Sequence, residues 1–292
     1  MLRVGLGQLA PGLGLLEKNL AAHARVIDEA RESGVNLLVF PELGLTGYLL
    51  QDLNAEVAMR ADDARLQELA ARAPDMSVVV GFVEESVDHR LYIAAALLEG
   101  GAVSHVYRKS YLPNYGLFDE RRFFAAGSQV RAVDSALGVR LGICICEDFW
   151  HLPIPYLLSL DGAQVLINIA SSPGRDIATT VDDLGSAQSW RTLMRAYAQL
   201  TTCAIVFVNR VGVDETVTFW GGSQVIAPSG AVVYEAPLLE EGLFIAELDM
   251  TEVRRERIAL PVLRDERPDF VLRQLERIIR DDAGVATDTQ AE

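Results

Sequence analysis

The sequence contains few of the residues that build disulfide frameworks or metal sites. Three cysteines and four histidines occur among its 292 residues. An odd, small number of cysteines argues against a disulfide scaffold and fits a reducing compartment such as the cytoplasm. Cys144 and Cys146 form a Cys-x-Cys pair, but no other cluster of cysteines and histidines matches it, so we expect neither a metal nor another cofactor.

Long apolar runs and an excess of basic residues are also missing. No apolar segment reaches the ~18 residues that a membrane helix needs, and the N-terminus enters a predicted strand without the layout of a signal peptide. The net charge is −15, which disfavours nucleic acid and anionic membranes as partners. Half of the residues are apolar, enough for a sizeable core. We expect one soluble domain over residues 1–280 and a flexible polar tail over 281–292.

Predicted strands and helices alternate along the chain, which is typical of α/β proteins. The apolar runs and turn residues predict strands over 2–9, 36–40, 77–84, 91–98, 102–107, 141–146, 164–168, 204–209, 219–227, 231–234 and 243–248. Helical spacing predicts helices over 16–33, 62–72, 153–160, 182–202 and 251–258. The pattern alone therefore predicts a sheet covered by helices.

Three of the predicted strands end in side chains with useful chemistry. Glu42 follows the strand that ends at Phe40, Lys109 follows the strand that begins at Val103, and Cys146 ends an apolar strand. Ligands of open α/β sheets bind at such strand ends. A thiol, a carboxylate and an ammonium can serve as nucleophile, base and stabiliser of an oxyanion.

Each residue also has an ordinary structural interpretation. An isolated buried cysteine is usually an inert core residue, and we interpret Cys144 and Cys203 in this way. In an extended strand, Cys144 and Cys146 would point to the same face. Lys109 alone could be a solvated charge, and Glu120 lies in a charged run that could form an exposed face.

The motifs VFPELGLTGY, YRKSYLPNYGLFDERRFF and GICICEDFW together resemble those of the nitrilase (carbon-nitrogen hydrolase) superfamily, which carries a Glu-Lys-Cys triad in this order. The resemblance extends from Arg3 to about Arg267. Its second and third motifs are most similar to the glutaminase domain of glutamine-dependent NAD synthetases. The resemblance implies a four-layer αββα sandwich that forms a homodimer or a higher oligomer through its helices. We expect the apolar residues Phe149, Trp150 and Leu152 to contribute near that interface.

The resemblance also implies roles for individual residues. Cys146 would be the nucleophile, and Glu42 would be the base in both halves of the reaction. Lys109 and the backbone N–H of Glu147 would stabilise the oxyanion, while Glu120 would orient the lysine or the substrate.

Further residues match the substrate pocket of the resembling glutaminase domains. Glu147 would contact the substrate ammonium, and Tyr115 and Phe118 would be aromatic pocket residues, although both could equally be packing residues. Ser172 and Arg175 would close the pocket. The segment that carries them is shorter than expected, so Arg175 could instead be a surface residue.

We therefore expect a cysteine-dependent amidohydrolase that releases ammonia from glutamine through a thioester. The sequence contains no SGGxDS pyrophosphatase loop, so the chain would be either a glutaminase subunit that passes ammonia to a separate synthetase or a free-standing amidase that kept the pocket. The main alternative is a hydrolase of N-carbamoyl compounds or other ω-amides, and a nitrile is a less favoured substrate. A more distant alternative is a binding module without catalytic activity.

Overall fold

The computed structural model describes residues 1–174 and 185–288. Its first six-stranded sheet has the order β14-β1-β2-β3-β4-β5 and contains β1 (Leu2–Gln8), β2 (Leu37–Val39), β3 (Ser77–Glu85), β4 (Leu91–Glu99), β5 (Ala102–Arg108) and β14 (Gly242–Leu248). The second has the order β13-β12-β9-β8-β7-β6 and contains β6 (Ala132–Asp134), β7 (Arg140–Ile145), β8 (Val165–Ala170), β9 (Ala204–Asn209), β12 (Gln224–Ile226) and β13 (Val232–Glu235).

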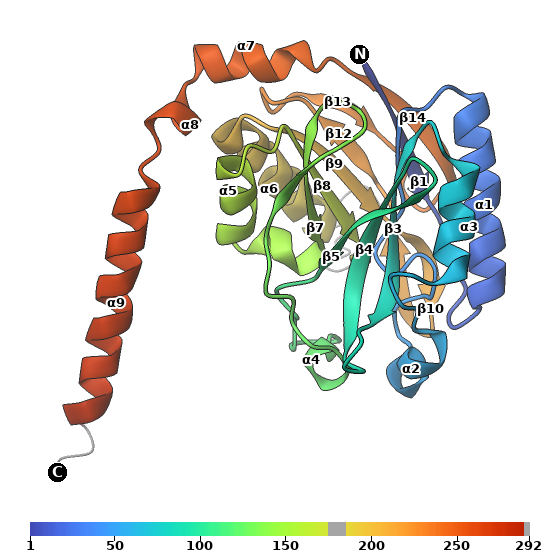
Figure 1. The fold of residues 1–292 in the computed structure, drawn as a ribbon, viewed down its shortest axis with the longest axis horizontal. Helices are drawn as coiled ribbons and strands as arrows, with labels where there is room; N and C mark the ends of the chain where they lie inside the picture. Colours follow the sequence, from blue (N-terminus) through green and yellow to red (C-terminus); the bar gives the residue numbers. More distant parts are fainter. Residues whose placement is uncertain (175–184, 289–292) are drawn as a thin grey trace.

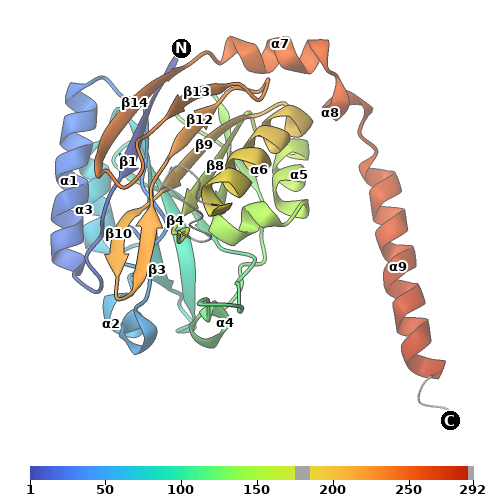
Figure 2. The ribbon, with the colours of Figure 1, turned by 180° about the vertical axis from the view of Figure 1, so that it is seen from behind.

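The two sheets lie face to face, and helices cover both outer sides (Figure 1). Helices α1 (Leu16–Glu32) and α3 (Ala64–Arg72) cover the first sheet, while α5 (Pro153–Leu160) and α6 (Gly185–Thr201) cover the second, as Figure 2 shows from behind. The smaller elements are η1 (Gln51–Leu53), α2 (Asn54–Val57), α4 (Glu120–Phe123), η2 (Cys146–Trp150), β10 (Val211–Asp214), β11 (Val217–Trp220), α7 (Thr251–Ala259), α8 (Val262–Asp265) and α9 (Pro268–Asp288). Within the described residues, no helix is long and apolar enough to cross a membrane.

Strand β3 shows how the sequence builds these layers. Successive side chains of a strand point to opposite faces. Val78 and Val80 belong to the apolar cluster under α1 and α3, whereas Val79 and Val83 belong to the larger cluster that includes the space between the sheets. The strand is therefore apolar on both faces, as expected where both faces are covered.

Parallel pairing brings the ends of the central strands to common edges. β7 pairs in parallel with β8, and β8 with β9. In the first sheet, β2 pairs in parallel with β1 and β3. Cys146 directly follows β7, Ser171 directly follows β8, and Glu42 comes shortly after β2.

Several predicted elements differ from the structure. The strand expected over 219–227 is interrupted at Gly221 and Gly222, whose φ angles are +72° and +59°. These angles suit glycine and break the extended backbone. Strands β6 and β10, helix α9 and the short elements η1, α2, α4, η2 and α8 were not predicted. Helix α9 projects away from the sandwich (Figures 1 and 2) and includes the predicted boundary at residue 280.

Candidate active site

The structure brings the ends of strands β2 and β5 and the start of helix α4 together around one buried ammonium. Lys109 Nζ lies 2.7 Å from Glu42 Oε1 and 2.7 Å from Glu120 Oε1. All three side chains are at least 96% buried. Lys109 is therefore not a solvated surface charge, and Glu120 does not lie on an exposed face. A buried ammonium with two carboxylates is a fixed charge cluster from which water is largely excluded.

The backbone turns sharply at Cys146. Strand β7 ends at Ile145, and Cys146 begins the short helix η2 with a φ of +46°. A positive φ is uncommon outside glycine and is typical of strained functional positions. The prediction that Cys146 is extended and shares a face with Cys144 is therefore wrong. Cys144 is fully buried, and its Sγ lies 3.3 Å from the carbonyl of Ile167.

The surroundings of Cys146 favour the neutral thiol. Burial raises its pKa well above the ordinary value, and Glu42 raises it further, while Lys109 acts in the opposite direction. A nucleophilic cysteine reacts as a thiolate. To act as a nucleophile, this thiol would need a base that takes its proton, and Glu42 is the neighbouring carboxylate that influences its pKa most.

Glu42 is held by the segment that follows β8. The backbone N–H of Ser171 donates to Glu42 Oε2 at 2.8 Å, and the Ser171 hydroxyl donates to the Glu42 carbonyl at 2.8 Å. With Lys109 on its other oxygen, the Glu42 carboxylate has one defined orientation. Sequence reasoning missed Ser171, because its contact joins residues 129 positions apart.

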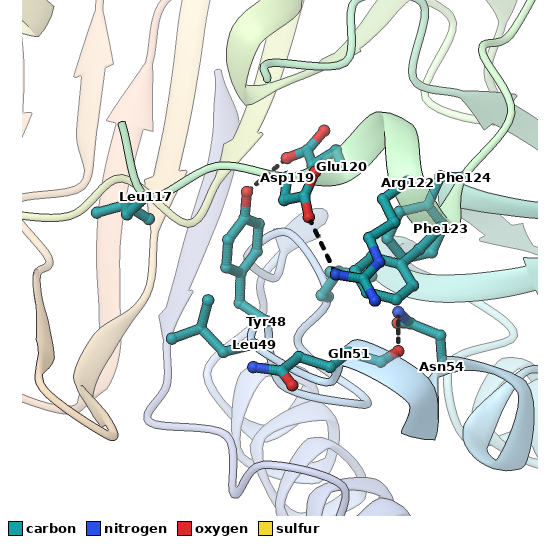
Figure 3. Close-up of a pocket in the computed structure, with 11 residues that line it drawn as sticks. Tyr48, Leu49, Gln51, Asn54, Leu117, Asp119, Glu120, Arg122, Phe123 and Phe124 are labelled. Carbon is teal, nitrogen blue, oxygen red and sulfur yellow. Dashed lines mark hydrogen bonds and ion pairs between the residues drawn. The ribbon is translucent and has the colours of Figure 1, made fainter. Parts of the chain in front are cut away.

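Glu120 is fixed by a tyrosine that the sequence did not identify. The Tyr48 hydroxyl donates to Glu120 Oε1 at 2.5 Å, as Figure 3 shows. The pKa of Glu120 is raised to about 7, chiefly by burial and also by Glu42, while Lys109 and Tyr48 act in the opposite direction. Burial lowers the pKa of Lys109, but Glu120 and Glu42 outweigh this and hold it well above its ordinary value.

Cys146 opens into a pocket of about 230 Å³. The pocket is lined by Tyr115, Phe118, Cys146, Glu147, Trp150, Ser172, Pro173, Gly185, Ser186, Ser189 and Trp190. Four of the five predicted substrate residues, Tyr115, Phe118, Glu147 and Ser172, therefore line the same pocket as the thiol. The fifth, Arg175, lies outside the described residues.

The model of the carbon-nitrogen hydrolase family matches residues 3–257. A glutamine-dependent NAD(+) synthetase of Thermotoga maritima is 35% identical over 266 residues, which cover 89% of this chain and 44% of the synthetase. An N-carbamoylputrescine amidase of Arabidopsis thaliana is 29% identical over 274 residues, covering 87% of this chain and 89% of that one. The solved glutamine-dependent NAD+ synthetase of Acinetobacter baumannii, 31% identical, superposes with a TM-score of 0.76 over 86% of this chain and 46% of that one.

This chain belongs to the carbon-nitrogen hydrolase family. It is an enzyme of that family with the expected αββα sandwich. The chain spans about half the length of the NAD synthetases that it matches.

Two side chains of this carbon-nitrogen hydrolase pair at the rim of the pocket. The Tyr115 hydroxyl donates to Glu147 Oε2 at 2.9 Å. His151 Nε2 lies 3.6 Å from the other oxygen of Glu147, and its ring stacks on Tyr111 with 3.6 Å between centroids. The Glu147 carboxylate is 12% exposed, so it is oriented but still reachable from the pocket.

Two tryptophans hold the hydroxyl group of Ser172 through hydrogen bonds. Its Oγ accepts hydrogen bonds from Nε1 of Trp190 at 2.9 Å and of Trp220 at 3.4 Å. Its backbone N–H donates to Asn209 Oδ1 at 2.8 Å. An oxygen that accepts two N–H groups has its own proton left to donate. The two indoles lie 18 and 48 positions from Ser172, and no local signal connects them to it.

A separate pocket of about 190 Å³ lies beside Tyr48 and Glu120 (Figure 3). Its lining includes Asp119 and Arg122, whose charged groups lie 3.8 Å apart. Cys146 is not among its lining residues. The pocket next to Cys146 is therefore the one in which an amide could meet the thiol.

Proposed function

We propose that this enzyme hydrolyses glutamine to glutamate and ammonia through a thioester on Cys146. The observation that carries the proposal is the carboxylate of Glu147, which accepts a hydrogen bond from Tyr115 and lines the same pocket as Cys146. A carboxylate in this position suits a substrate ammonium. The pocket volume of about 230 Å³ is below the range of drug-sized sites and favours a small substrate.

In the proposed reaction, Glu42 takes the proton of the Cys146 thiol, and the sulfur attacks the amide carbon. Lys109 and the backbone N–H of Glu147 stabilise the oxyanion that forms. The C–N bond then breaks, and the nitrogen leaves as ammonia with the proton held by Glu42. Water that is deprotonated by Glu42 attacks the thioester, which releases the acid and restores the thiol.

The α-carboxylate of glutamine distinguishes this substrate from a simple amine. Because Ser172 Oγ accepts from two indoles, its proton is available for that carboxylate. N-carbamoylputrescine is the second candidate, since Glu147 would also bind its amine and the Arabidopsis relative aligns over most of both chains. That substrate has no carboxylate for Ser172 to bind.

Ammonia release should be compared for glutamine, asparagine, N-carbamoylputrescine and propionamide. We expect glutamine to react fastest, and we expect Ser172→Ala to reduce kcat/KM for glutamine more than for N-carbamoylputrescine. Turnover of N-carbamoylputrescine without turnover of glutamine would transfer the assignment to the second candidate. If no amide reacts and iodoacetamide modifies Cys146 no faster than Cys144, the chain is a binding module.

The setting of the reaction is part of the same proposal. The enzyme would work in the cytoplasm, where its three free cysteines stay reduced, and would supply its ammonia to a synthetase. It would form a dimer through the surface near α5, where Trp150, Leu152 and Leu157 are 45%, 69% and 45% exposed. Phe149 is fully buried, so the expectation that it lies at this interface is wrong.

A further inference from the structure

Asp148 is a buried carboxylate that the proposed reaction does not use. It lies two residues after Cys146, in helix η2, and its side chain is fully buried. Burial raises its pKa to about 6, although hydrogen bonds from the backbone of Ile145 and Tyr111 counteract the rise. Burying a carboxylate costs free energy unless hydrogen bonds compensate. The groups that donate hydrogen bonds to the Asp148 carboxylate therefore indicate its role in the structure.

Four donors converge on this carboxylate from two different sheets. Asp148 Oδ2 accepts from the Ile145 N–H at 3.0 Å and from the Tyr107 hydroxyl at 2.8 Å. Its Oδ1 accepts from the backbone N–H groups of Ser110 and Tyr111 at 3.0 and 2.9 Å. Hydrogen bonds to an ionised acceptor are short and strong.

The positions of these donors along the chain are informative. Tyr107, Ser110 and Tyr111 flank Lys109 on both sides, at the end of β5 in the first sheet. Ile145 and Asp148 flank Cys146, at the end of β7 in the second sheet. One side chain therefore connects the segment that carries the ammonium to the turn that carries the thiol.

We propose that Asp148 is a positioning residue that sets the placement of the Lys109 ammonium relative to the Cys146 thiol. The bond from the Ile145 N–H closes the turn that holds Cys146 at its positive φ. The three bonds to the lysine segment hold Lys109 against this turn. A displacement of about 1 Å in a catalytic group can reduce a rate by roughly 10²-fold. The proposal depends on the roles proposed for Cys146 and Lys109.

The test uses a graded set of variants. Asp148→Ala removes all four bonds, and Asp148→Asn replaces one acceptor oxygen with a donor. Tyr107→Phe removes one of the four bonds together with the 3.1 Å hydrogen bond between the Tyr107 and Ser110 hydroxyls. Asp161→Asn is the matched control. The Asp161 carboxylate accepts the Ala132 N–H at 2.8 Å and an N–H of Arg140 at 3.0 Å, so it secures the opposite end of β7.

Iodoacetamide labelling at pH 7.5, followed residue by residue with mass spectrometry, does not depend on the identity of the amide substrate. We expect Cys146 to react about 10-fold more slowly in Asp148→Ala, because its thiolate loses the placed ammonium. Asp148→Asn should lie between Asp148→Ala and wild type, Tyr107→Phe should be about 2-fold slower than wild type, and Asp161→Asn should be unchanged. A purely structural role has the opposite signature, because loosening the core exposes all three thiols and accelerates their labelling.

Turnover of the best amide of the panel provides the second measurement. We expect Asp148→Asn to reduce kcat by about 10-fold or more and to change KM by less than about 3-fold, because Glu147 and Ser172 still form the pocket. Labelling of Cys146 at the wild-type rate or faster in Asp148→Asn and Tyr107→Phe would overturn the proposal, even if Asp148→Ala does not fold. If wild type hydrolyses no amide but labelling responds as expected, the proposed function fails and the role of Asp148 stands.

Discussion

Substitution of Glu120 by glutamine should change how the stability of the protein depends on pH. Glu120 is 4% exposed, and its pKa is raised from 4.5 to about 7, chiefly by burial. Between pH 4.5 and 7, the Glu120 carboxyl is therefore mostly protonated in the folded state and mostly ionised in the unfolded state. Stability from this group is fully present below pH 4.5 and is lost as the pH rises through about 7.

The size of the effect follows from the shift. Each pKa unit corresponds to about 1.4 kcal/mol, so the wild-type protein should lose about 3 kcal/mol of unfolding free energy from this group by pH 8. Glutamine has a similar shape and does not titrate. The stability of Glu120→Gln relative to wild type should therefore rise by about 3 kcal/mol between pH 4.5 and 8.

Thermal unfolding of both proteins at pH 5, 6, 7 and 8 measures this difference. The entropy of unfolding scales with chain length, so a chain of 292 residues should shift by roughly 1.6 °C per kcal/mol. The pH range from 5 to 8 covers about 2.5 kcal/mol of the effect, so the difference in Tm should change by roughly 4 °C. Glu56→Gln, which alters an exposed glutamate, is the control and should show no such trend. If the difference stays constant over this pH range, Lys109 keeps Glu120 ionised throughout, and burial is not the dominant influence.

Glu120→Gln should still bind substrate but turn it over more slowly, because Lys109 loses one of its two anionic partners.

Further expectations concern the reaction and the oligomer. Cys146→Ala should abolish ammonia release while circular dichroism shows an intact fold, and Cys144→Ala should stay near the wild-type rate; the reverse result would refute the assignment of the nucleophile. Glu42→Gln should lose nearly all turnover in steady-state assays, since one base serves both half-reactions, so near wild-type rates would contradict that role. Glu147→Ala should raise KM for glutamine by about 10- to 100-fold, as expected for a lost charge-assisted hydrogen bond, but should change KM for propionamide little; equal changes would contradict the contact with the ammonium. Sedimentation at micromolar concentration should show a dimer that Leu152→Asp weakens, and a wild-type monomer would exclude the proposed interface.

The local sequence pattern predicted most of the strands. Strand β9 was predicted with its observed bounds, since a short apolar run between polar residues indicates a buried strand. The pattern also placed Glu42, Lys109 and Cys146 at strand ends, but their assignment as a triad came from the resemblance to the nitrilase superfamily and stays a prediction. The pattern could not reveal that Glu120 and Glu42 share one ammonium, because this depends on how segments 67 and 11 positions away from Lys109 are placed around it.

The errors have local physical causes. The sequence can indicate a positive φ at a glycine but not at a cysteine, so the hydrophobic pattern did not predict the turn at Cys146. Residues 281–288 of helix α9 were interpreted as part of a tail because of their polar composition, and residues 268–280 were given no predicted element. The ion pair between Arg277 and Asp281, at 2.8 Å and four positions apart, supports the helix beyond residue 280. The flexible tail over 281–292 stays a prediction.

The charges of the site explain why the proposed mechanism needs a second glutamate. Lys109 alone would favour the thiolate of Cys146, but Glu42 and Glu120 raise the pKa of the thiol, and burial raises it most. These surroundings therefore favour the protonated thiol of Cys146 over the thiolate, which is the reactive form. The pKa of Glu120 is raised to about 7, chiefly by burial. This carboxylate can therefore take up a proton, and its attraction for the Lys109 ammonium then becomes weaker. Lys109 is then left to Glu42 and to the oxyanion, the two groups whose charge changes during the proposed reaction.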